Sequence, residues 1–199
     1  MVSVIQLAMI FFIVTNPIGN CPTIITLIKD YSIKQQQKIL FRESIFSMIL
    51  AILFLFLGEI FLTSFQIQNY ALTISGGILL FIVALKMIFS DRLKTKTDTP
   101  KQAPFIVPIA TPLLSGAGLL TMIMLYSKEE ANDLKMLCAI LLAWVGITTV
   151  LVTAPYLQIF LGKRGLAALE QLTGMLLAMI AIQMIVQGSG LFLTLLFAV

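Results

Sequence analysis

Two short clusters rich in proline, glycine and small polar residues carry the groups of this sequence that could bind a ligand. They are Asn16-Pro17-Ile18-Gly19-Asn20-Cys21-Pro22 and Thr111-Pro112-Leu113-Leu114-Ser115-Gly116-Ala117-Gly118. Pro17 lacks an amide hydrogen and disfavours helical dihedral angles at Asn16, so a helix is expected to open there. Gly19 permits a tight backbone path, and Asn20 is a suitable N-cap for a second half-helix.

The second cluster has the same arrangement of residue types. Thr111 precedes Pro112, and Ser115 can cap the helix that follows. Gly116 and Gly118 leave the backbone amides uncrowded. A half-helix N-terminus carries unpaired amides and roughly half a positive elementary charge, which suits a carboxylate. Freed carbonyls and side-chain oxygens suit an ammonium group, so the two clusters together predict a site for a small zwitterion.

Both clusters fall within long apolar segments of a very apolar chain. The chain is 59% hydrophobic and 11% charged, whereas ordinary globular domains are about 45 to 50% apolar. Six segments are long enough to span a bilayer. They cover residues 4–28, 44–65, 70–89, 104–127, 136–161 and 171–187, and the run 191–199 is an interfacial tail or an extension of the last helix. We therefore expect an all-α polytopic membrane protein with six transmembrane helices, of which the first and fourth are interrupted.

Lysine and arginine residues predict the orientation of these helices. Ten of them lie in the first, third and fifth loops: Lys29, Lys34, Lys38, Arg42, Arg92, Lys94, Lys96, Lys101, Lys163 and Arg164. The remaining loops and the two ends carry only Lys128 and Lys135, while Lys86 lies inside a helix. By the positive-inside rule, the ten face the cytoplasm and both termini lie on the non-cytoplasmic side.

The two halves of the chain resemble each other. An offset of 97 aligns Gly77 with Gly174 and Ala84 with Ala181, while an offset of 95 aligns Asn16 with Thr111. Chance identity between apolar helices is the alternative, but the rare breaks also fall into register. Because each half has three spans, the second enters the membrane from the opposite side, as an inverted repeat. We expect one membrane domain, 1–199, with repeat one at about 1–95 and repeat two at about 100–199.

The predicted substrate-binding residues come from the two clusters. They are Asn16, Pro17, Gly19, Asn20, Thr111, Pro112, Ser115, Gly116 and Gly118. The alternative is that both prolines merely kink packed helices, because proline and glycine are frequent in membrane helices. Other polar residues are interpreted structurally: Glu59 and Lys86 as interfacial anchors, Arg42 and Glu43 as the start of the second helix, and Glu170 as the start of the sixth.

Several other classes of function are not expected. The chain has no histidine, and its two cysteines, Cys21 and Cys138, lie in apolar segments, so no metal site, cofactor or disulfide framework is expected. An enzyme would need a nucleophile with a base, which the scattered carboxylates do not provide. The net charge of +4 resides in short loops, so nucleic acid is not expected as a partner. The expected partners are a small-molecule solute and membrane lipid.

The first cluster resembles the signature near the start of MarC family integral membrane proteins. Residues 58–59, 74–78, 86–89 and 104–113 also resemble family blocks in the same order. The resemblance implies a multi-pass inner-membrane protein of bacterial type, with archaeal relatives described as transporters of small neutral amino acids. Two departures matter: Asn16 stands where relatives often have aspartate, and Ala117 where they often have proline. The first leaves no acidic group at this break, which puts any coupling to a proton or cation gradient in doubt.

The predicted function is therefore transport of small neutral solutes, with small amino acids as the favoured class. In this interpretation, rocking of the two repeats alternates access to a site at the midplane of the membrane. The alternative is a lipid-handling or structural membrane protein, in which the broken helices form a groove for a phospholipid-like head group.

Overall fold

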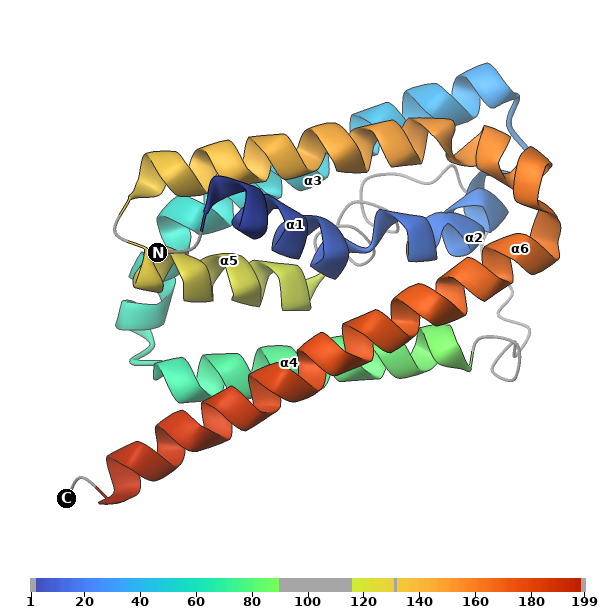
Figure 1. Cartoon of the computed structure of the whole chain (residues 1–199). Helices are drawn as coiled ribbons and strands as arrows, with labels where there is room; N and C mark the ends of the chain where they lie inside the picture. Colours follow the sequence, from blue (N-terminus) through green and yellow to red (C-terminus); the bar gives the residue numbers. More distant parts are fainter. Residues whose placement is uncertain (1–2, 90–115, 131, 198–199) are drawn as a thin grey trace.

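The computed structural model describes residues 3–89, 116–130 and 132–197, and this part of the chain is almost entirely helical (Figure 1). The helices are α1 (Val4–Thr15), α2 (Pro17–Ile28), α3 (Ile33–Ser64), α4 (Asn69–Ile88), α5 (Ala117–Glu129) and α6 (Asp133–Phe197). The long α6 is two helices joined at Gly162, whose dihedral angles (φ 64°, ψ 178°) are not helical. No strand is present in the described residues, so the all-α prediction is confirmed.

Five stretches of the described residues are long and apolar enough to cross a membrane. They are Val4–Ile28, Ile33–Gly58, Asn69–Ile88, Asp133–Leu157 and Arg164–Phe197. The predicted fourth span, 104–127, lies partly outside the described residues, which include its second half as the 13-residue α5. The protein is therefore a helical membrane protein with at least these five candidate spans.

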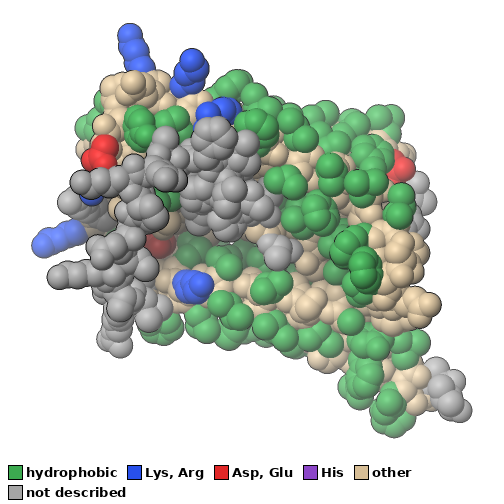
Figure 2. Space-filling view, turned by 180° about the vertical axis from the view of Figure 1, so that it is seen from behind, with side chains coloured by type: hydrophobic (Ala, Val, Ile, Leu, Met, Phe, Trp, Pro, Cys, Tyr) green, Lys and Arg blue, Asp and Glu red, His purple; other side chains and the backbone are tan. Residues whose placement is uncertain are grey.

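The helices form three layers (Figure 1). In the middle, α1 and α2 run almost end to end, with α5 beside α1. The first half of α6 lies with α3 on one side, and the second half of α6 crosses α4 on the other. The core between them contains large, fully buried side chains such as Trp144, Phe11 and Ile24. On the outside, Figure 2 shows hydrophobic side chains spread over much of the described surface, with Lys and Arg towards one end, as expected for a surface that contacts lipid.

Two predicted helix starts are wrong. The second helix was expected to open at Arg42 and Glu43, but α3 begins at Ile33, so both residues lie about three turns inside it. Its start is fixed by Gln35, whose Oε1 accepts hydrogen bonds from the Ser32 backbone amide (3.1 Å) and the Ser32 hydroxyl (3.0 Å). Because this cap stabilises the helix start, the polar residues at the beginning of α3 are helical and continue directly into the apolar span.

The last helix is also longer than predicted. Its span runs from Arg164 to Phe197, so Glu170 lies inside the helix, not at its first turn, and is only 8% exposed. The run after Gly188-Ser189-Gly190 continues as helix up to Phe197. The extension was one of the two predicted fates of this run. Glycine does not break a helix here because a membrane offers no water to stabilise an opened backbone.

Two glycines bring α4 and α6 into close contact. A Cβ atom built on Gly77 would lie 2.8 Å from the carbonyl oxygen of Ala181 and 3.1 Å from the backbone nitrogen of Ile185. A Cβ atom built on Gly174 would lie 3.3 Å from the carbonyl oxygen of Ala84 and 3.2 Å from a side-chain carbon of Ile88. Small residues at such crossings allow membrane helices to pack backbone against backbone.

The joint at Gly162 gives a first testable prediction. Its backbone combines a positive φ with an extended ψ, a region that is essentially restricted to glycine. Gly162→Ala is therefore expected to lose about 1–3 kcal/mol of stability although a Cβ there would meet nothing within 4 Å. Gly190→Ala is the matched control, because Gly190 is helical and also has open space around it. Equal thermal midpoints of the two variants in detergent would contradict the prediction.

Candidate functional site

The break in the first span is centred on Asn16. This residue adopts the left-handed conformation (φ 49°, ψ 55°) and is 5% exposed. Its backbone amide donates to the carbonyl of Phe12 (3.0 Å), which closes α1. Its side-chain Oδ1 accepts from the amide of Gly19 (3.1 Å), which caps α2. Asparagine suits both tasks because it tolerates left-handed dihedral angles and is a strong N-cap. The first helix is therefore interrupted where the sequence predicts.

The residues after the break have different roles from those predicted. Pro17 is the first residue of α2, a position where its missing amide hydrogen costs nothing. Gly19 and Asn20 are already inside this helix, so Asn20 is not its N-cap. Instead, the Asn20 side-chain Nδ2 reaches back across the break and donates to the carbonyl of Thr15 (3.1 Å). Asn20 thus satisfies a carbonyl that the end of α1 leaves without a helical partner.

Most of the amides expected to hold an anion are used within the break itself. Pro17 has none, the amide of Gly19 donates to the Asn16 side chain, and the amide of Asn20 donates to the Asn16 carbonyl (3.1 Å). The backbone amides of Gly19 and Asn20 are therefore already hydrogen-bonded and are not open to an anion.

The break is packed against α4 and α6 by two residues that the sequence did not mark as part of the site. Asn16 Nδ2 donates to the thioether sulfur of Met87 in α4 (3.1 Å). A Cβ atom built on Gly19 would collide with the Met87 methyl group and lie 2.5 Å from Thr173 Oγ1 in α6. The offset of 97 also aligns Met87 with Met184, whereas nothing in the sequence signalled Thr173. A thioether is a weak acceptor, so the Asn16 donor is available to a stronger one.

The second cluster is described only in part. Thr111, Pro112 and Ser115 lie outside the described residues. Gly116 caps α5 with an extended ψ of 154°, and a Cβ on Gly118 would collide with Leu80 of α4. In addition, α5 lies against α1, where the rings of Tyr126 and Phe11 meet edge to face at 6.4 Å. The helix after the second cluster thus packs beside the helix before the first break.

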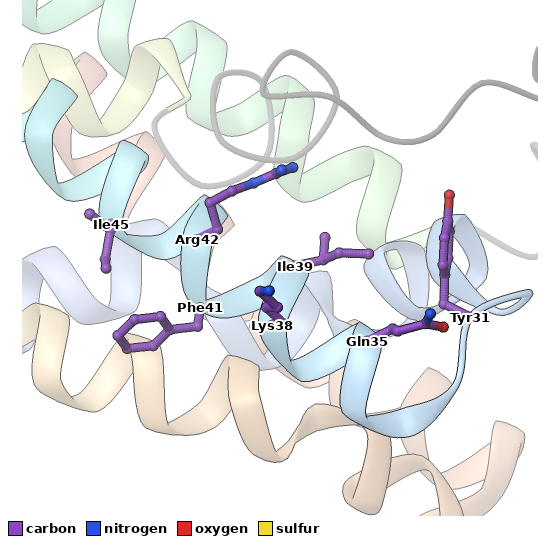
Figure 3. Close-up of a pocket in the computed structure, with 7 residues that line it drawn as sticks. All are labelled: Tyr31, Gln35, Lys38, Ile39, Phe41, Arg42 and Ile45. Atoms are coloured by element: carbon purple, nitrogen blue, oxygen red, sulfur yellow. The ribbon is translucent and has the colours of Figure 1, made fainter.

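Two surface grooves lie away from the break. The larger, of about 450 Å³, is lined by Tyr31, Gln35, Lys38, Ile39, Phe41, Arg42 and Ile45. Figure 3 shows Tyr31 at one end, Ile45 at the other, and Lys38 and Arg42 between them. The second groove, of about 390 Å³, lies between α1 and the first half of α6 and is mostly apolar. Neither is lined by a predicted site residue.

Comparisons with known proteins identify the family. The family described as MarC family integral membrane protein matches residues 1–192. The inner membrane protein YhgN of Escherichia coli K12 is 35% identical over 187 residues, which cover 93% of this chain and 95% of that protein. A membrane protein of Chlamydia trachomatis is 34% identical over 182 residues, covering 90% of this chain and 89% of its own. No solved structure matches the chain. The chain therefore belongs to the MarC family of integral membrane proteins.

Proposed function

We propose that this protein transports small neutral amino acids across the inner membrane by alternating access around the break between α1 and α2. The observation that carries the proposal is the buried Asn16 side chain inside a candidate span, whose Nδ2 donates to the thioether sulfur of Met87. A carboxylate oxygen is a much stronger acceptor than a thioether sulfur. A solute carboxylate would therefore displace Met87 from Asn16.

The packing around the break favours a small solute. A Cβ atom at Gly19 would collide with the flexible end of Met87 and with the hydroxyl of Thr173. Movement of the Met87 side chain would open a space of a few atoms, whereas a larger opening requires displacement of α4 or α6. Glycine and alanine match the smaller space, and buried backbone breaks of this kind occur in membranes where they line a cavity.

The contacts of α4 and α6 support the proposed inverted repeat. Gly77 of α4 meets Ala181 and Ile185, and Gly174 of α6 meets Ala84 and Ile88. Under the offset of 97, each contact is the copy of the other, because Gly77 pairs with Gly174, Ala84 with Ala181 and Ile88 with Ile185. Reciprocal contacts are what a two-fold axis between the copies produces. We therefore retain the proposal of six spans in two inverted repeats, with both termini on the non-cytoplasmic side and rocking of the repeats as the transport movement.

Lipid handling is the second candidate, and the groove in Figure 3 favours it. Lys38 and Arg42 stand beside apolar side chains there, an arrangement that suits an anionic head group with an acyl chain. Since that groove does not include the break, the two functions predict different sensitive residues. Substitution of Lys38 would impair a lipid site, and substitution of Asn20 would impair an amino-acid site.

Uptake by reconstituted vesicles tests the transport proposal. Wild-type protein is expected to take up labelled alanine and glycine, and Asn20→Leu to reduce the rate about 10-fold or more. The reason is that leucine leaves the buried carbonyl of Thr15 without the donor it has at 3.1 Å, a loss of about 1–3 kcal/mol at the break. Asn69→Leu is the matched control, because Asn69 is exposed at the start of α4. Equal uptake by wild type and Asn20→Leu would show that the site lies elsewhere, and uptake that depends on Lys38 alone would favour the lipid function.

A further inference from the structure

Glu43 is a buried carboxylate with an unused oxygen inside a candidate membrane span. Its side chain is 0% exposed. Oε1 accepts from Nη2 (2.8 Å) and Nε (3.2 Å) of Arg42, whose side chain is 46% exposed. Oε2 is buried and has no hydrogen-bond partner within the described part of the chain. A buried carboxylate oxygen without a donor is costly, particularly in a membrane, and marks a functional position.

The neighbours of Glu43 do not supply the missing donor. Ser44 and Ser47 are also fully buried on this side of α3. The Ser44 hydroxyl lies 2.6 Å from Thr148 Oγ1, and the Ser44 carbonyl accepts from Trp144 Nε1 at 2.9 Å. Residues 144–151 of α6 and all of α1 and α2 contain no charged side chain. The charged residues of the other packed helices lie at Lys86, Lys128, Glu129, Asp133, Lys135, Lys163, Arg164 and Glu170.

The first half of α6 shows that Glu43 and the break lie at about the same depth. α1 and α2 run in the same direction as the first half of α6, with Phe12 of α1 against Gly146 and Cys21 of α2 in a cluster with Ala154. α3 runs the opposite way, with Ser44 beside Thr148 and Gln37 beside Val152. At 1.5 Å per residue, Asn16 and Glu43 both project onto α6 near residue 150, within about one turn of each other.

We propose that Oε2 of Glu43 binds the ammonium group of the transported amino acid. The inference rests on the proposed transport function and adds the recognition of the amine to it. Arg42 engages Oε1 and leaves Oε2 open to an N–H donor. An ammonium supplies three such donors and a charge opposite to that of the carboxylate. The site would thus bind amino-acid zwitterions in preference to simple carboxylic acids, which lack the ammonium group.

Equilibrium binding to the purified full chain tests this assignment with three probes: alanine, propionate and methylammonium. Propionate lacks the amine, and methylammonium lacks the carboxylate. Wild-type protein is expected to bind alanine more tightly than propionate. Glu43→Gln is expected to weaken the binding of alanine and of methylammonium about 10-fold or more, and to leave the binding of propionate unchanged. Glu130→Gln is the control, because Glu130 is paired with Lys135 beyond the end of α5.

The possible outcomes separate the two proposals. If Glu43→Gln keeps the wild-type ratio of alanine to propionate affinity, the ammonium assignment is wrong although transport stands. If methylammonium binding depends on Glu43 but no amino acid binds, the ammonium site is supported and the proposed amino-acid transport is wrong. An effect of Glu43→Gln on the pH dependence of uptake alone, at unchanged alanine affinity, would overturn the assignment in favour of proton binding. Should Glu43→Gln not fold, Glu43→Asp is expected to keep the charge and weaken methylammonium by retracting the oxygen.

Discussion

Gly77→Val is expected to lower the stability of the protein by about 3 kcal/mol or to prevent its folding, because overpacking at this site meets backbone. The first carbon of any side chain at Gly77 would lie 2.8 Å from the Ala181 carbonyl oxygen. It would also lie 3.1 Å from the Ile185 nitrogen. A flexible side chain could move away, but backbone atoms move only if the two helices separate. The measurement is the midpoint of thermal unfolding in detergent, together with the fraction of monodisperse protein.

Two further glycines serve as comparisons for this variant. Gly174→Val is expected to be destabilising to a similar degree, because a Cβ there would meet Met87 Cβ at 3.0 Å and the Ala84 carbonyl at 3.3 Å. Gly190→Val is expected to change stability by only about 0.5 kcal/mol, since Gly190 is exposed and has no atom within 4 Å of the built Cβ. A Gly77→Val midpoint equal to that of Gly190→Val would mean that α4 and α6 do not pack as described.

The sequence predicts those features that follow from composition and from the chemistry of proline. Long apolar runs identify membrane helices, and Pro17 identifies the place where the first one opens, because no tertiary contact can restore its missing amide hydrogen. The alignment of Gly77 with Gly174 also pointed to positions that share one type of contact. Local covalent chemistry and residue size were sufficient in each of these cases.

The features that the sequence did not predict depend on contacts between distant segments. Asn16 and Asn20 are equally good caps in isolation, and their roles are decided by which side chain reaches the carbonyl of Thr15 and which reaches the amide of Gly19. Met87 lies 71 positions beyond its partner Asn16. Glu43 is predicted at a helix start, but the polar residues before it belong to α3, which begins at Ile33. The capping by Gln35 explains why they are helical.

Substitutions of Asn16 are expected to separate its backbone role from its proposed role in binding. Asn16→Ala should lose about 1–2 kcal/mol of stability because alanine is strained in the left-handed conformation. It should lose about 1 kcal/mol more because alanine cannot accept the capping hydrogen bond from the amide of Gly19. Asn16→Gly should cost only a few tenths of a kcal/mol as a cap, because glycine adopts these dihedral angles freely. Neither variant keeps the Nδ2 donor that faces Met87. Thermal unfolding in detergent measures the first effect and alanine uptake by vesicles the second.

The glycine variant decides between the two roles. If Asn16 binds the solute, Asn16→Gly is expected to unfold near the wild-type temperature and yet take up alanine about 10-fold more slowly, because a charge-assisted hydrogen bond is lost. Wild-type uptake by Asn16→Gly, with a defect confined to Asn16→Ala, would reduce Asn16 to a hinge in the backbone. The solute carboxylate would then have to be held by groups other than this side chain.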